Sequence, residues 1–214
     1  MGLKQNLDWL MDDLAKTAES AGRNPAEVKL VAVTKGRSID EIRQCYDLGL
    51  RHFGESRLQD ALPKVENLPD DIIWHYIGPL QSNKAKKVGE SFTWVHSLDS
   101  LQSAKELHKA GRMIQCCVQV NLTGELQKSG ICKEGLDEFI EKVLECSQVQ
   151  VRGLMTISRE EAEAEETRTV FRELRTLACA RGLDVLSMGM SGDYRLAVLE
   201  GATFVRIGSL LFQS

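Results

Sequence analysis

Eight short runs of apolar, β-prone residues recur along the 214-residue chain, and a helical pattern separates each run from the next. The first run, residues 30–35, is continuous rather than alternating, which is typical of a parallel strand covered on both faces. The other runs are residues 51–54, 72–77, 93–97, 113–121, 149–157, 185–190 and 204–207. Strands that alternate with helices in this way, the longest helix being expected at residues 160–181, predict parallel pairing through helical crossovers.

Eight such units, with no change in composition that would indicate a linker, predict one α/β domain over residues 1–214, folded as a (β/α)8 TIM barrel. A doubly wound open sheet is the alternative, but no G-x-G-x-x-G motif follows the first strand. Apolar residues at helical spacing predict an extra helix from Leu3 to about Ala21. Because the segment after strand eight is too short for a full helix, we expect the opening helix to cover that part of the barrel wall. We expect no C-terminal β domain.

The composition excludes several classes of function. With 27 basic and 31 acidic residues the net charge is −4, so the chain lacks the excess of basic residues that nucleic acids and anionic membranes select. No apolar run reaches the length of a membrane span, and the N-terminal pattern is not that of a signal peptide. We therefore expect a cytoplasmic protein that binds small molecules. The six cysteines form no C-x-x-C pair and have no histidine at ligand spacing, so no metal site and no disulfide framework is expected.

Lys35 ends the first apolar run and is the first candidate site residue. Alternation of side chains along a strand places Val31, Val33 and Lys35 on one face. Burial in an apolar interior favours the neutral amine, the form that attacks a carbonyl group, which makes Lys35 a candidate for a Schiff base. The alternative is that Lys35 marks the point where the strand emerges into water, as most lysines are exposed.

The ends of the seventh and eighth runs carry residues suited to an anion. In a (β/α)8 barrel, phosphate is most often held at the C-terminal ends of strands seven and eight. The seventh run leads into Ser191 ahead of a helical segment, and the eighth offers Arg206, Gly208 and Ser209. Each of these residues alone also has a structural explanation. Because strand eight closes against strand one, this phosphate site and Lys35 would be neighbours, which describes a site for a phosphorylated aldehyde held as an imine. Pyridoxal 5′-phosphate fits that description.

Seven segments carry a resemblance to a known family. They are residues 31–35 (VAVTK), 51–55 (RHFGE), 74–84 (WHYIGPLQSNK), 128–130 (KSG), 152–155 (RGLM), 186–191 (LSMGMS) and 205–208 (VRIG). With these segments the chain resembles the pyridoxal phosphate homeostasis proteins, which share the barrel of fold-type III enzymes such as alanine racemase. The resemblance covers nearly the whole chain, and its longest segment is highly specific.

The resemblance implies a set of cofactor-binding residues and no catalytic residue. The set is Lys35 as the internal aldimine, Ser191, Gly208 and Ser209 at the phosphate, Arg206 near the pyridine ring, and Met190, Ser56 and His75. One departure from the family pattern is that Ser56 and Arg57 stand where the family usually has Asn-Tyr. For His75, a buried and hydrogen-bonded core histidine is the alternative.

Two functions are compatible with such a site. The first is a carrier, without robust turnover, that stores and delivers pyridoxal phosphate and keeps free aldehyde low. We expect it to be a monomer, with amino acids and pyridoxal phosphate-dependent apo-enzymes as further partners. The second is a small amino-acid racemase, which needs a second base on the far face of the substrate. In racemases of this fold that base is a tyrosine from an additional domain; here only Tyr194, after the phosphate loop, could approach the cofactor. A Schiff-base aldolase is a third alternative, but it has no use for a cofactor phosphate site.

Overall fold

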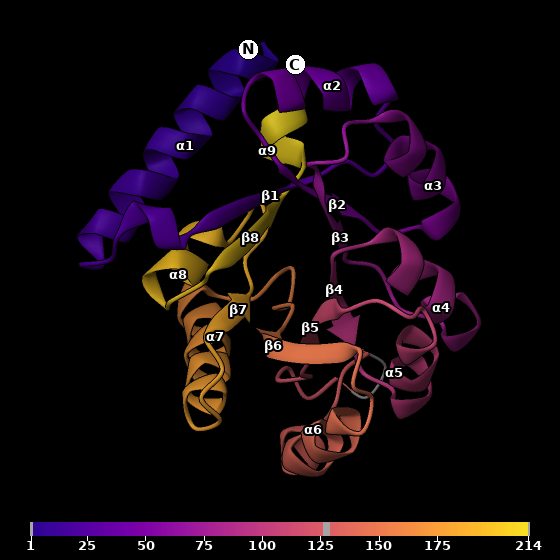
Figure 1. Ribbon diagram of the computed structural model, residues 1–214. Coiled ribbons are helices and arrows are strands. Elements are labelled where there is room, and N and C mark those ends of the chain that lie inside the picture. Colours follow the sequence, from indigo (N-terminus) through magenta and orange to yellow (C-terminus); the bar gives the residue numbers. More distant parts are fainter. Residues whose placement is uncertain (1, 126–128, 214) are drawn as a thin grey trace.

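Eight parallel strands close into a barrel in the computed structural model, which describes residues 2–125 and 129–213 (Figure 1). The strands are β1 (Lys29–Val33), β2 (His52–Glu55), β3 (Ile73–Tyr76), β4 (Trp94–Leu98), β5 (Ile114–Gln119), β6 (Val149–Met155), β7 (Val185–Ser187) and β8 (Phe204–Ile207). Each strand pairs with the next in sequence, and β8 pairs with β1. The predicted TIM barrel is therefore confirmed, and the open doubly wound sheet is not formed.

Helices occupy the connections and surround the barrel (Figure 1). They are α1 (Leu3–Ser20), η1 (Pro25–Glu27), α2 (Ile39–Asp47), α3 (Leu58–Asn67), α4 (Ser82–Ser91), α5 (Leu101–His108), η2 (Lys133–Gly135), α6 (Leu136–Leu144), α7 (Ala164–Cys179), α8 (Tyr194–Leu199) and α9 (Ser209–Phe212). Among the residues that the structure describes, no helix is long and apolar enough to cross a membrane. Lys128, which belongs to one of the segments that carry the resemblance, lies outside the described residues.

Several expected boundaries are wrong, two of them by three or four residues. Strand β7 ends at Ser187 rather than at residue 190, because Gly189 adopts a φ of 90° that an extended strand does not contain. Helix α7 begins at Ala164 rather than at residue 160. The segment 160–166 carries five glutamates, and like charges three or four residues apart destabilise a helix.

The opening helix α1 covers the barrel wall beside β8, as expected. Its buried face of Leu7, Leu10, Leu14 and Ala18 contacts α8 and α9, and Figure 1 shows it alongside both. The Asn6 side chain donates hydrogen bonds to the backbone carbonyls of residues 211 and 213, at 3.2 and 2.7 Å. The helix thus supplies the apolar cover that the four-residue α9 is too short to provide.

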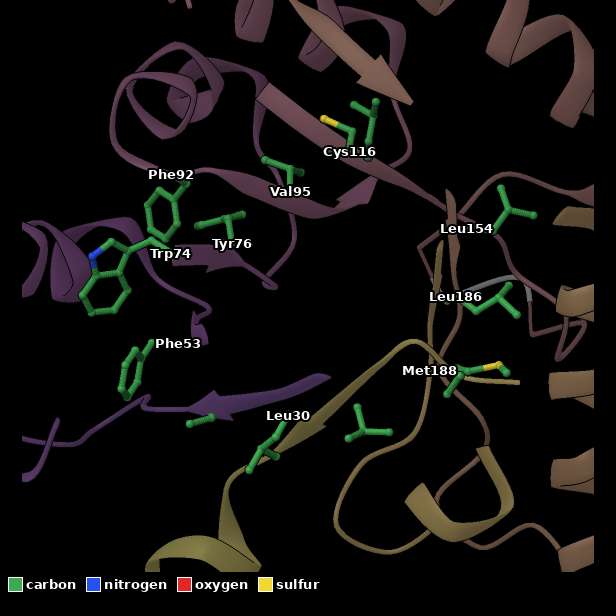
Figure 2. Close-up of a cluster of buried hydrophobic side chains, with 14 of the residues drawn as sticks. Leu30, Phe53, Trp74, Tyr76, Phe92, Val95, Cys116, Leu154, Leu186 and Met188 are labelled. Carbon is green, nitrogen blue, oxygen red and sulfur yellow. The ribbon is translucent and has the colours of Figure 1, made fainter. Parts of the chain in front are cut away.

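The strands bury side chains on both faces. The outward side chains, among them Phe53, Trp74 and Leu154, pack against the helices (Figure 2). The inward side chains form a smaller cluster inside the barrel, consisting of Val31, Trp94, Cys117, Met155 and Phe204. Successive residues of β5 follow this alternation, with Cys116 outside and Cys117 inside, both fully buried.

Candidate functional site at the C-terminal ends of the strands

Lys35 lies in an exposed turn just beyond β1. The strand ends at Val33, Thr34 is buried, and the chain turns at Lys35 and Gly36, where Gly36 has a φ of 73°. The expectation of a lysine carried into the apolar interior is therefore wrong, because this left-handed glycine ends the strand before Lys35 can continue it. The side chain stands at the mouth of the barrel, exposed to water.

A buried cluster of Thr34, Glu55 and Lys64 beneath this turn holds it in place. The Thr34 hydroxyl donates to Glu55 Oε1 at 2.7 Å, and Lys64 Nζ contacts the same oxygen at 2.6 Å. Lys64 also donates to the Thr34 backbone carbonyl at 2.9 Å. The side chains of Glu55 and Lys64 are only 1% and 7% exposed. The residue before Lys35 is thus fixed by an ion pair between β2 and α3.

This ion pair was missed at the level of the sequence, although a signal for Lys64 exists. Leu58, Ala61 and Lys64 are the buried residues of α3, so the lysine falls at helical spacing on the apolar face of its helix. A lysine in that position requires a buried acidic partner. The sequence does not identify Glu55 as that partner, since it lies on the preceding strand.

The loop after β7 carries Met190 and Ser191. Gly189 is required at its start, because a Cβ there would lie 2.5 Å from the Cβ of Ala197. Met190 is 38% exposed and Ser191 is half-buried in the turn before α8. Asp193 shapes this turn by accepting a hydrogen bond from the Met190 backbone N–H at 2.6 Å.

The loop after β8 lies directly beside the end of β1. In the β1–β8 register, Val31 pairs with Arg206, so Gly208 follows alongside Val33. A Cβ on Gly208 would lie 3.2 Å from the Val33 carbonyl oxygen, which shows how closely the two backbones approach. Ser209 is exposed at the start of α9. The Arg206 backbone N–H donates to the Gly189 carbonyl at 2.9 Å and so joins the two loops. The expected closure of strand eight on strand one is confirmed, and it brings these loops to the turn of Lys35.

Arg206 points into the barrel and is only 5% exposed. Its guanidinium donates to Ser187 Oγ at 2.5 Å and to the Thr156 backbone carbonyl at 3.1 Å. Burial lowers the pKa of Arg206 to about 10, partly offset by the charge of Asp193, so the side chain remains charged at neutral pH. A cation with hydrogen bonds to neutral oxygens therefore lies directly beneath the loops after β7 and β8.

His75 and Ser56, also expected at the site, have different surroundings. His75 is fully buried on β3, and both of its ring nitrogens face other histidines, His52 at 2.9 Å and His96 at 2.8 Å. This geometry agrees with the alternative of a hydrogen-bonded core histidine. Ser56 is half-buried after β2, and its backbone touches Gly78, where a Cβ would lie 2.1 Å from the Ser56 carbonyl oxygen. Gly78, which belongs to the longest of the seven segments, is thus needed because any larger residue would collide with the backbone of Ser56.

Tyr194 does not approach the site, which corrects the expectation from sequence. Its side chain is 3% exposed, and its hydroxyl donates to Asp13 Oδ2 on α1 at 2.6 Å. Burial and the bond to Asp13 raise the pKa of Tyr194 to about 12. The tyrosine fastens the opening helix to α8 and is not free to exchange a proton with a ligand.

The comparisons with known proteins agree with this architecture. Residues 5–214 match the family model of the alanine racemase N-terminal domain. The pyridoxal phosphate homeostasis protein of Pseudomonas aeruginosa is 42% identical over 217 residues, which cover 98% of this chain and 94% of the relative. The chain belongs to the family of pyridoxal phosphate homeostasis proteins. The resemblance noted from the sequence segments is thereby confirmed.

Other members of the family extend this agreement to solved structures. The homeostasis protein of Synechocystis is 42% identical over 200 residues, covering 88% of this chain and 92% of the relative. PipY of Synechococcus elongatus, at 38% identity, covers 99% of this chain and 100% of its own. Its structure without pyridoxal phosphate superposes with a TM-score of 0.87, and its structure with pyridoxal phosphate bound with a TM-score of 0.85.

Proposed function

We propose that this protein binds pyridoxal 5′-phosphate as a Schiff base on Lys35 and acts in intracellular pyridoxal phosphate homeostasis. In this role it stores and delivers the cofactor and limits the free aldehyde. Two observations support the proposal: the curated relatives are named pyridoxal phosphate homeostasis proteins, and PipY has been solved with pyridoxal phosphate bound. Apo-enzymes that use the cofactor are the partners that the proposal requires.

The observation that carries the proposal is the β1–β8 register. It aligns Val31 with Arg206, and so sets the turn of Lys35 beside Gly208 at the mouth of the barrel. The turn with the exposed amine thus begins just after Val33, whose backbone lies against Gly208, and the exposed Ser209 follows that glycine. These are the groups that a phosphorylated aldehyde needs, a nucleophile at one end and hydrogen-bond donors at the other.

The residues present fit the cofactor in charge as well. Bound pyridoxal phosphate would supply an aldehyde for imine formation and a ring that withdraws electrons. In the proposal, the backbone and hydroxyl groups at Ser191, Gly208 and Ser209 hold the phosphate, and Arg206 provides a buried positive charge near the pyridine ring. Met190 and Ser56 border the same mouth of the barrel.

A racemase of the same fold is the second candidate, and the tyrosines favour the carrier. All three tyrosine hydroxyls of the chain donate hydrogen bonds elsewhere: Tyr46 to Asp71 at 2.7 Å, Tyr76 to the Pro79 carbonyl at 3.3 Å, and Tyr194 to Asp13 at 2.6 Å. A two-base racemase needs an unengaged base opposite the lysine. The carrier needs none.

Absorbance spectroscopy tests the imine. Purified protein mixed with pyridoxal phosphate should show a visible band that borohydride removes, and Lys35→Ala should abolish the band. Lys86→Ala, which removes an exposed lysine of α4, is the matched control and should leave the band intact. A wild-type protein that is colourless after excess pyridoxal phosphate has been removed by gel filtration would refute the proposed function.

Two further measurements test the phosphate site and the absence of turnover separately. Equilibrium dialysis should detect residual binding by Lys35→Ala, because the phosphate donors do not depend on the imine; a complete loss would show that the phosphate site is misassigned. Proton NMR in D₂O should show that wild-type protein exchanges the Cα hydrogen of alanine far more slowly than the ~1 to 10³ turnovers per second of an ordinary enzyme. Exchange at racemase rates would favour the second candidate.

A further inference from the structure

Three histidines form a continuous chain of ring contacts through the interior of the barrel, which we name the histidine column: His52, His75 and His96. His52 Nδ1 lies 2.9 Å from His75 Nε2, and His75 Nδ1 lies 2.8 Å from His96 Nε2. His96 Nδ1 in turn lies 2.6 Å from Ser187 Oγ, the same oxygen that accepts a hydrogen bond from Arg206. The column therefore leads from the start of β2 to the guanidinium beneath the proposed site.

Aromatic rings enclose the column and keep its polar atoms in an apolar environment. The Phe204 ring lies 6.0, 5.2 and 5.4 Å from the rings of His52, His75 and His96. Trp94 stacks on His75 at 6.0 Å with an interplanar angle of 11°. His75 and His96 are fully buried, while His52 is half-buried. Unpaired nitrogens in such surroundings are costly, so each must be matched by its neighbour.

Matching the donors with the acceptors gives the column one direction. Arg206 can only donate, so Ser187 Oγ accepts from it and must place its own hydrogen elsewhere. The partner available is His96 Nδ1, which then accepts and leaves the proton of His96 on Nε2. The same reasoning continues outward: His96 donates to His75, and His75 donates to His52. All three imidazoles are then neutral and carry their proton on Nε2.

The opposite order leaves a hydroxyl without a partner. If each Nδ1 carried the proton, both Arg206 and His96 would donate to Ser187 Oγ. The Ser187 hydrogen would then have no acceptor among its contacts in the described residues. A buried hydroxyl with no acceptor loses the hydrogen bond that water would otherwise accept from it, and this penalty decides between the two tautomeric orders.

We propose that the histidine column is a directional hydrogen-bond relay whose members are positioning residues for Arg206. By donating to His96, Ser187 keeps a lone pair directed at the guanidinium and so fixes the plane in which Arg206 presents its remaining N–H groups. Neutral imidazoles add no positive charge beside the buried cation. The relay acts on Arg206 itself and does not depend on the proposed cofactor.

The charges that face the column favour its neutral state. Burial, with the neighbouring histidines, holds the pKa of His75 well below its ordinary value, and burial with Arg206 and His52 does the same for His96. For His52, burial and the charge of Lys29 lower the pKa. The aromatic rings of Trp94 and Phe204 that pack against the column carry no charge.

Nitrogen-15 NMR of the imidazoles in the full-length wild-type protein tests the relay directly, because protonated and unprotonated ring nitrogens differ strongly in chemical shift. We expect His75 and His96 to show an unprotonated Nδ1 and a protonated Nε2 throughout the range from pH 8 to pH 6. His108, which lies on α5 outside the barrel, provides the fourth signal and completes the assignment. An Nδ1-protonated or doubly protonated His96 in this range would overturn the proposal.

Substitution of Ser187 separates the relay from simple packing. In Ser187→Ala the donor to His96 is absent, so we expect the ring signals of His96 and His75 to move toward a mixture of tautomers. Ser187→Thr retains the hydroxyl and should keep the wild-type tautomer. If Ser187→Ala is folded by circular dichroism and its tautomers are unchanged, the serine does not direct the column and the proposal fails. If Ser187→Ala does not fold, the Ser187→Thr and wild-type spectra still decide the direction.

Discussion

Lys64→Met should destabilise the protein strongly, although Lys64 is not one of the residues proposed to bind the cofactor. The substitution leaves the Glu55 carboxylate buried with only the Thr34 hydroxyl as a donor, and Glu55 Oε2 already has no hydrogen-bond partner among the described residues. Removing one partner of a buried ion pair costs about 3–5 kcal/mol. For a chain of this size each kcal/mol shifts the melting temperature by about 2–4 °C, so the expected decrease is roughly 6–20 °C.

Thermal unfolding followed by circular dichroism at neutral pH measures this effect. The double variant Glu55→Leu/Lys64→Met replaces the whole pair with apolar side chains, and it should recover most of the lost stability because no uncompensated charge remains. Lys142→Met is the matched control, since Lys142 pairs with Glu138 on the exposed face of α6 and should matter little. If Lys64→Met melts like the wild type, the polar group under the Lys35 turn does not hold it, and the reasoning is refuted.

Two further predictions concern the opening helix and the response to pH. Leu10→Ala should cost about 2–5 kcal/mol in urea unfolding, because Leu10 is fully buried against the barrel wall, whereas Met11→Ala, at an exposed position, should change little; equal effects would contradict the packing of α1. Stability should also fall below pH 6.5, because the pKa values of His75 and His96 are depressed in the folded state and only the unfolded chain takes up their protons. The contribution of the two groups is fully present above pH 6.5 and is lost at up to about 2.7 kcal/mol per pH unit below it. A flat stability from pH 6.5 to 5.5 would show that these imidazoles are protonated in the folded protein.

The barrel could be predicted from the sequence because its determinants are local. Each strand is a short apolar run, and the helices carry their own start signals, as at Ser38, where the serine hydroxyl and the Glu41 side chain cap the backbone N–H groups of α2 reciprocally. The residues at which the strands end were harder to predict from the sequence. Whether Lys35 continues the strand or turns into water depends on one glycine dihedral, and a pattern of residue types does not reveal which glycine will adopt it.

The site could be predicted only in part, because several of its contacts depend on register. Arg206 and Gly208 were recognised from the known position of phosphate sites in this fold, but the partners of Arg206 were not. The histidine column left one signal in the sequence: its members are 23 and 21 residues apart, about one strand–helix unit, on three consecutive strands. That spacing places inward-facing residues of neighbouring strands side by side, whereas the contact with Ser187, 91 residues beyond His96, follows only from the closed barrel.

Arg206 and its neutral surroundings bear on why a protein that holds so reactive a cofactor would leave it intact. Pyridoxal phosphate promotes loss of a Cα proton best when its ring nitrogen is protonated, and a carboxylate partner supports that state. Arginine can only donate hydrogen bonds and keeps its charge, so a ring nitrogen held against Arg206 would have to accept a hydrogen bond and would remain unprotonated. The neutral imidazoles of the histidine column also supply no proton, because His96 accepts a hydrogen bond from Ser187 and passes none to it. With all three tyrosine hydroxyls bound elsewhere, the site that we propose can hold the aldehyde firmly while providing little of what turnover requires.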